Sequence, residues 1–168
     1  MEEFLDTGLR KQIRQVFEDM REPVSIIIFG SASKCEYCEE TIQLLTEVTA
    51  LSDLLTLEVH DLDEDSELAS HYHVDKAPGI VIAGGRGEDI IDFGIRYYGV
   101  PAGSEFGALI NDLLTVSKRE SGLSKETLAF LAGLQEPVHL MVFSTPNLTV
   151  LPASRGACSS YGVGKPAG

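Results

Sequence analysis

Two cysteines three positions apart, in Cys35-Glu36-Tyr37-Cys38, are the residues whose type and spacing point most directly to chemistry. Such a pair can carry out thiol–disulfide exchange or supply half of a zinc site. The thiolate is the species that attacks a disulfide, and a free thiol with a pKa near ~8.5 supplies only a few per cent of it at pH 7. A helix N-terminus stabilises the thiolate through unpaired amide donors and the helix dipole. We therefore predict that Cys35 is the nucleophile and that Cys38, one helical turn later, resolves the mixed disulfide.

The charged neighbours of this pair act in opposite directions. Lys34 would stabilise a thiolate at Cys35, whereas the carboxylates of Glu36, Glu39 and Glu40 would destabilise it. Because of the helix position, we expect the net effect to place the pKa of Cys35 below that of a free cysteine.

A zinc site would require two more ligands at a suitable spacing. The third cysteine, Cys158, lies far along the chain, and the four histidines include only one close pair, His71 and His73. The acidic stretch 61–67 is more typical of a solvated turn and helix start than of a cation site. We expect no bound metal, and no cofactor apart from the redox-active disulfide itself.

The composition narrows the class of protein. Among 168 residues there are 26 Asp and Glu against 13 Lys and Arg, so the formal net charge is −13. This charge repels phosphate, which argues against partners such as nucleic acid or an anionic membrane surface. No apolar run approaches the ~20 residues of a membrane span, and the first residues lack the pattern of a signal peptide. Three cysteines are too few for a disulfide scaffold, so we expect a cytoplasmic protein.

The elements that must position the cysteines follow from the periodicity of apolar residues. Residues 5–20 have helical spacing, and the β-branched run Val24–Phe29 predicts a buried strand just before the Cys35–Cys38 motif opens a second helix. Further strands are predicted at 55–60, 79–83 and 90–94, and further helices at 66–72, 104–116 and 124–134. This order, with the cysteine motif between the first strand and its helix, predicts a thioredoxin-like α/β fold, a central mixed sheet flanked by helices.

The sequence also contains a partial repeat. When Glu22–Val24 is aligned with Glu136–Val138, Phe29 meets Phe143 and the apolar positions between them coincide. A repeat of this kind predicts a second structural unit, although it has no CxxC motif at the matching positions. From Pro146 onward there is no Asp or Glu and no periodicity. We predict one complete domain over residues 1–118, the first helix and strand of a second unit over 119–145, and an irregular tail over 146–168.

Three motifs resemble those of the protein disulfide oxidoreductases, glutaredoxin-like proteins with two tandem thioredoxin folds. They are Cys35–Cys38, Val74–Pro78 and the stretch Phe93–Phe106. The last is also similar to the N-terminal domain of peroxiredoxin-reductase flavoproteins. In the family, the second unit opens with its own CxxC motif, which this sequence matches only through Phe143–Pro146. The resemblance therefore implies a tandem protein whose second unit is truncated.

The resemblance implies further site residues. It places Pro78 opposite the CxxC motif, with a cis bond between Ala77 and Pro78. Such a bond would turn the backbone of Ala77 toward a substrate chain for strand-like pairing, and we expect Ala77, Pro78 and Tyr37 to bind the substrate. The alternative is that Pro78 is an ordinary proline at the start of an edge strand.

The expected function is that of a thiol–disulfide oxidoreductase, which reduces, forms or reshuffles disulfides in protein substrates. One alternative is a dithiol electron relay to a peroxiredoxin-type partner, and another is a non-catalytic remnant or interaction module of a truncated two-domain protein. Expected partners are protein dithiols and disulfides, with a thioredoxin-reductase-like electron donor. The predicted strand Val138–Phe143 would have no neighbour in one unit, so we expect a homo-oligomer through it.

Overall fold

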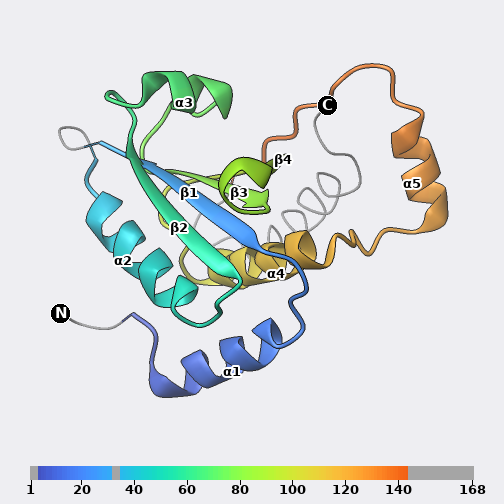
Figure 1. Cartoon of the computed structure of the whole chain (residues 1–168). Coiled ribbons are helices and arrows are strands. Elements are labelled where there is room, and N and C mark those ends of the chain that lie inside the picture. The colour runs from blue at the N-terminus through green and yellow to red at the C-terminus, as the bar shows by residue number, and fades with distance from the viewer. Residues whose placement is uncertain (1–3, 32–34, 144–168) are drawn as a thin grey trace.

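The computed structural model describes residues 4–31 and 35–143, and its strands form one mixed sheet (Figure 1). The strands are β1 (Val24–Gly30), β2 (Leu55–Asp61), β3 (Gly79–Gly84) and β4 (Ile91–Tyr98). Their order across the sheet is β2-β1-β3-β4, with β1 parallel to β2 and the other two pairs antiparallel. The predicted thioredoxin-like α/β fold is confirmed by this topology.

Helices cover both faces of the sheet. They are α1 (Thr7–Phe17), α2 (Cys38–Thr49), α3 (Ser66–His71), α4 (Ser104–Lys118) and α5 (Lys125–Ala132), and a short 3₁₀ helix, η1, spans Gly87–Asp89. Every residue of β1 is buried, as its β-branched sequence predicts for a central strand. Ile26 and Ile28 pack into a core shared with α1, α2 and α4, whereas Ile27 and Phe29 pack with residues of α3 and the loop after it. The alternating side chains of β1 thus anchor helices on opposite faces of the sheet (Figure 1).

Strand β4 is longer than predicted. The sequence predicted a strand over 90–94, whereas the structure continues it to Tyr98. Phe93, Ile95 and Tyr97 alternate into the larger core, and the intervening polar positions are partly buried by an ion pair between Asp92 and Arg96. The polar residues in this stretch hid the alternation that marks a strand.

The N-terminal segment is attached to α2 by one carboxylate. Glu47 accepts hydrogen bonds from the backbone N–H groups of Phe4 and Leu5, each at 3.0 Å, and from the guanidinium of Arg10 at 3.0 Å. Burial raises the pKa of Glu47, but the hydrogen bonds and the charge of Arg10 outweigh it and hold this pKa below its ordinary value. The ionised form is therefore the one that stabilises the fold.

We expect Glu47→Gln to lower the free energy of unfolding by about 1–3 kcal/mol at pH 7, because charge-assisted hydrogen bonds to a side chain only 12% exposed are weakened. The folded pKa lies below the unfolded one, so this stabilisation is complete above pH ~4.3 and is lost as pH falls through the folded value. In urea unfolding, the difference from the wild type should shrink between pH 7 and pH 3. Glu18→Gln removes the same charge from an exposed position at the end of α1 and is the control. An equal loss in both variants would contradict the role of Glu47.

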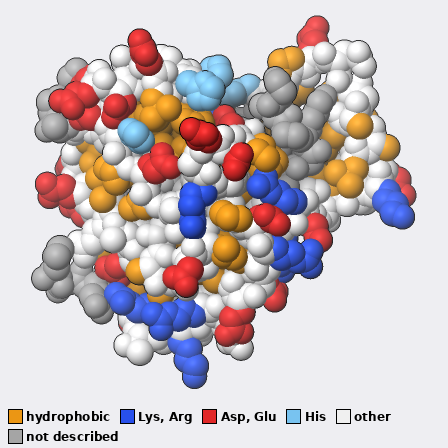
Figure 2. Space-filling model, in the orientation of Figure 1, with side chains coloured by type: hydrophobic (Ala, Val, Ile, Leu, Met, Phe, Trp, Pro, Cys, Tyr) orange, Lys and Arg blue, Asp and Glu red, His pale blue; other side chains and the backbone are white. Residues whose placement is uncertain are grey.

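The segment after α4 contains one correction. The predicted helix is present as α5, but residues 138–143 have no regular secondary structure, so the strand expected over Val138–Phe143 is wrong. A strand requires a neighbour for its backbone groups, and within the described residues neither edge of the sheet pairs with this segment. Apolar side chains are exposed along α5 and after it, on the arm at the right of Figure 2: Leu128, Phe130, Val138, Leu140, Met141 and Phe143. The division into a domain and the start of a second unit stays a prediction.

Candidate active site

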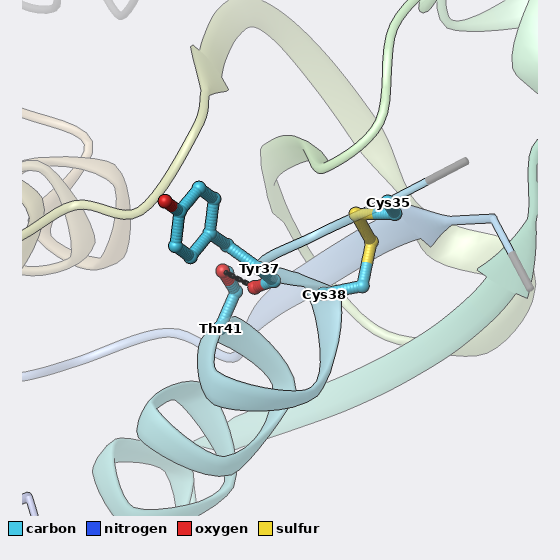
Figure 3. The surroundings of a disulfide bond; sticks show 4 residues. All are labelled: Cys35, Tyr37, Cys38 and Thr41. Carbon is cyan, nitrogen blue, oxygen red and sulfur yellow. Dashed lines mark hydrogen bonds between the residues drawn. A yellow bond between two sulfur atoms is a disulfide. The ribbon is translucent and has the colours of Figure 1, made fainter.

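Cys35 and Cys38 are joined as a disulfide at the start of α2, with their Cα atoms 5.5 Å apart (Figure 3). Cys38 is the first residue of the helix and is only 7% exposed, whereas Cys35 lies before the helix and is partly exposed. An incoming thiolate or disulfide can therefore reach the sulfur of Cys35 more readily than that of Cys38. This asymmetry is the one that the predicted roles of nucleophile and resolving cysteine require.

The sulfur of Cys38 lies against the end of β1. A Cβ atom added at Gly30 would lie 3.4 Å from the Sγ of Cys38 and 3.9 Å from the carbonyl oxygen of His60. The absence of a side chain at Gly30 lets the first turn of α2 pack closely on the sheet. The disulfide is thereby held at the carboxyl ends of β1 and β2, where ligands bind in open α/β sheets.

Tyr37 precedes the helix and is 52% exposed. Its carbonyl oxygen accepts hydrogen bonds from the backbone N–H of Thr41 at 3.1 Å and from the Thr41 hydroxyl at 2.6 Å. In Figure 3 its ring extends from the helix start in the direction opposite to the disulfide. The backbone at Tyr37 is thus fixed by α2 while its ring is accessible from solvent.

The electrostatic surroundings of the disulfide are acidic among the described residues. Glu39 and Glu40 lie in the first turn of α2, and Glu36 precedes it, all three exposed. Lys34, the cation predicted beside Cys35, lies outside the described residues, as does Cys158. First-turn carboxylates favour the helix but oppose a thiolate nearby.

The loop before β3 reaches the same end of the sheet as the disulfide. The peptide bond between Ala77 and Pro78 is cis, the isomer that the resemblance implies. Pro78 is buried and Ala77 is partly exposed. Gly79, which follows, pairs with Phe29, the residue before Gly30. The structure therefore brings the predicted substrate-binding loop and the cysteine pair to adjacent strands.

The sequence did not place two aromatic residues at this end of the sheet. His60 on β2 pairs with Phe29, and their rings stack with centroids 5.6 Å apart. The Nδ1 atom of His60 lies 3.1 Å from a carboxylate oxygen of Asp65. Tyr98 on β4 pairs with Gly79. A correct register of the four strands would have identified both residues, because each occupies the row of the sheet that contains Phe29.

The structure separates the other histidine pair from this site. His71 ends α3 and makes an edge contact with the ring of Tyr72 at 4.9 Å, and His73 follows in a left-handed conformation. Among residues 4–31 and 35–143, no group of three or more potential ligands is arranged to hold a metal ion. In the same residues no helix is long and apolar enough to cross a bilayer.

Comparison with known proteins agrees with this geometry. No family model matches the sequence. The alkyl hydroperoxide reductase protein AhpF is 26% identical to the chain in Pseudomonas aeruginosa and 27% identical in Pseudomonas putida, in each case over 131 residues. The match covers 78% of this chain but 22% of each relative, so the chain spans about a fifth of their length.

Solved structures extend the comparison. A protein disulfide oxidoreductase from Aeropyrum pernix superposes with a TM-score of 0.82 at 28% identity, covering 93% of this chain and 66% of that one. The chain fits the thioredoxin-like oxidoreductase family. An N-terminal domain of alkyl hydroperoxide reductase AhpF from Enterococcus faecalis also has a TM-score of 0.82, at 22% identity, covering 95% of this chain and 75% of that one. The latter likeness concerns the fold of this thioredoxin-like oxidoreductase.

Proposed function

We propose that this chain is a thiol–disulfide oxidoreductase that acts on disulfides in protein substrates. The observation that carries the proposal is the Cys35–Cys38 pair, one sulfur accessible and the other buried against β1, at the active end of a thioredoxin-like sheet. The likeness to a protein disulfide oxidoreductase supports it. No further cofactor is needed, because the cysteine pair itself carries two electrons.

The exchange would proceed in two balanced steps. The thiolate of reduced Cys35 attacks one sulfur of the substrate disulfide, forms a mixed disulfide and releases the other substrate sulfur as a thiolate. The thiolate of Cys38 then attacks the sulfur of Cys35, which restores the Cys35–Cys38 bond and releases the second substrate thiolate. The substrate is reduced by two electrons and the cysteine pair is oxidised by two. The reverse sequence forms a disulfide in the substrate.

A complete cycle requires a dithiol donor, which we propose to be a partner resembling thioredoxin reductase. The cytoplasm is the compartment we propose, because few cysteines and an acidic composition suit a reducing environment. Ala77, Pro78 and Tyr37 remain the proposed substrate contacts. Self-association through residues 138–143 also remains a prediction, and the exposure of Phe143, at 78%, is consistent with it.

A second candidate function is a dithiol relay that passes electrons to one peroxiredoxin-type partner. The relatives that favour it are components of alkyl hydroperoxide reductases. A relay would react rapidly with its own partner and slowly with unrelated protein disulfides. Steady reduction of a generic protein disulfide, such as insulin with dithiothreitol as donor, would favour the general oxidoreductase.

The reduction potential of the Cys35–Cys38 couple tests both candidates against a non-catalytic module. We expect a value within about −270 to −120 mV, the range of proteins that exchange disulfides. It can be measured by equilibrating the protein in glutathione buffers of known ratio and trapping free thiols with an alkylating mass tag. A potential outside this range, together with no turnover of insulin, would favour the remnant or interaction module.

A further inference from the structure

Tyr98, the last residue of β4, supports the loop over residues 73–78 that leads into β3. Its hydroxyl donates a hydrogen bond to the carbonyl oxygen of His73 at 3.3 Å, and the Nζ atom of Lys76 lies 5.6 Å from the centre of its ring. Its ring edge is 3.5 Å from the position that a Cβ atom would take at Gly79. One side chain thus contacts the start, the middle and the end of the loop.

The loop is tightly folded beneath this ring. A Cβ atom at Gly79 would lie 2.5 Å from a methyl carbon of Val74 and 2.6 Å from the carbonyl oxygen of Lys76, so only glycine fits there. The backbone N–H of Gly99, next to Tyr98, donates to the carbonyl oxygen of Pro78 at 3.1 Å. The end of β4 therefore holds the loop through its side chain and its backbone together.

The loop presents backbone groups that the rest of the described chain does not use. Within residues 4–31 and 35–143, neither the N–H nor the C=O of Ala77 makes a hydrogen bond, although the backbone groups of Val74 and Pro78 on either side do. Ala77 is partly exposed, so an extended chain can reach it. Because Gly79 pairs with Phe29 and Gly30 contacts Cys38, this free backbone lies on the strand next to the one that supports the disulfide. Strand-like pairing with a peptide uses groups of this kind.

We propose that Tyr98 is a positioning residue that selects for polypeptide substrates. It holds the 73–78 loop so that the backbone of Ala77 can pair with an extended segment of the substrate while that segment's disulfide meets Cys35. The inference rests on the proposed function and deepens it. Small disulfides have no backbone to pair, so their reaction with Cys35 is independent of Tyr98. The ring itself is 43% exposed, which places it beside the bound segment.

The test compares two substrates on the full chain. We expect Tyr98→Leu to raise the KM for insulin about tenfold with little change in kcat, as the loss of a weakly held backbone contact would do. The rate with 2-hydroxyethyl disulfide should stay within about twofold of the wild type. Tyr98→Phe keeps the ring and removes only the bond to His73, so its KM for insulin should rise about twofold. Ile91→Ala, a truncation of another exposed apolar residue at the opposite end of β4, is the control and should change neither substrate.

Each outcome decides the role of Tyr98. Equal losses with both substrates would show that Tyr98 only stabilises the fold, and an unchanged KM for insulin would show that it does not position the loop; either result overturns the proposal. If Tyr98→Leu fails to fold in a thermal melt, the KM of Tyr98→Phe decides in the same way. Failure of the proposed function is a separate result, because the wild type would then turn over neither disulfide.

Discussion

Cys35→Ser is expected to reduce disulfide turnover to the background rate, whereas Cys38→Ser should stop the cycle after its first step. Cys35 carries the accessible sulfur, and a serine hydroxyl cannot replace its thiolate at neutral pH. In Cys38→Ser the attack by Cys35 still occurs, but no second thiolate releases the substrate. Insulin reduction measures the first effect. A covalent adduct that dithiothreitol reverses, seen on a non-reducing gel or by mass spectrometry, measures the second.

Cys158→Ser is the matched control for this pair. It removes the third thiol of the chain and should leave turnover unchanged, because Cys158 has no part in the proposed cycle. Full activity of Cys35→Ser would refute its assignment as the nucleophile. Adducts that form through Cys38 in the Cys35→Ser protein, with none in Cys38→Ser, would reverse the two roles.

Arg96→Met should lower the free energy of unfolding by about 3–5 kcal/mol, the usual cost of leaving one partner of a buried ion pair uncompensated. The guanidinium of Arg96 donates to both carboxylate oxygens of Asp92, at 2.9 and 2.5 Å, and also to the carbonyl oxygen of Tyr72 at 2.8 Å. The side chains of Arg96 and Asp92 are only 14% and 23% exposed. The pair therefore joins β4 to the end of α3, on the face of the sheet opposite α2.

Acidity provides a second check on this ion pair. Burial raises the pKa of Asp92, but the hydrogen bonds and charge of Arg96, with the N–H of Gly94, outweigh it and leave the pKa below its ordinary value. The folded pKa is the lower one, so the stabilisation is present above pH ~3.9 and is lost as pH falls through the folded value. The gap between wild type and Arg96→Met in urea unfolding should therefore be large at pH 7 and smaller at pH 3.

Two further variants make the measurement specific to burial. Arg21→Met breaks an ion pair with Glu120 of similar length, 2.9 Å, but with both side chains 62% exposed, and should cost less than about 1 kcal/mol. The double variant Asp92→Asn with Arg96→Met removes the uncompensated charge and should recover part of the loss. A cost at Arg96 as small as that at Arg21 would contradict the argument from burial.

Local patterns predicted most of the architecture of this protein. The β-branched run of β1, the helical spacing in α1, α2 and α4, and the cysteine pair between β1 and α2 were visible as short-range features. They are short-range because periodicity and helix position depend on neighbours within a few residues. The identity of the reactive cysteines required nothing more, since spacing alone confines a disulfide to residues one turn apart.

Tertiary pairing decided the rest. The register across β2, β1, β3 and β4 brings His60, Phe29, Gly79 and Tyr98 into one row, although these residues are far apart in the sequence. The same dependence explains the error at Val138–Phe143, where an apolar run resembled β1 but no neighbouring strand pairs with it among the described residues. The sequence by itself determined the chemistry of the cysteine pair, because that chemistry depends on adjacent residues. Only the tertiary structure decided which sulfur is accessible and which loop faces a substrate, because both depend on contacts between strands.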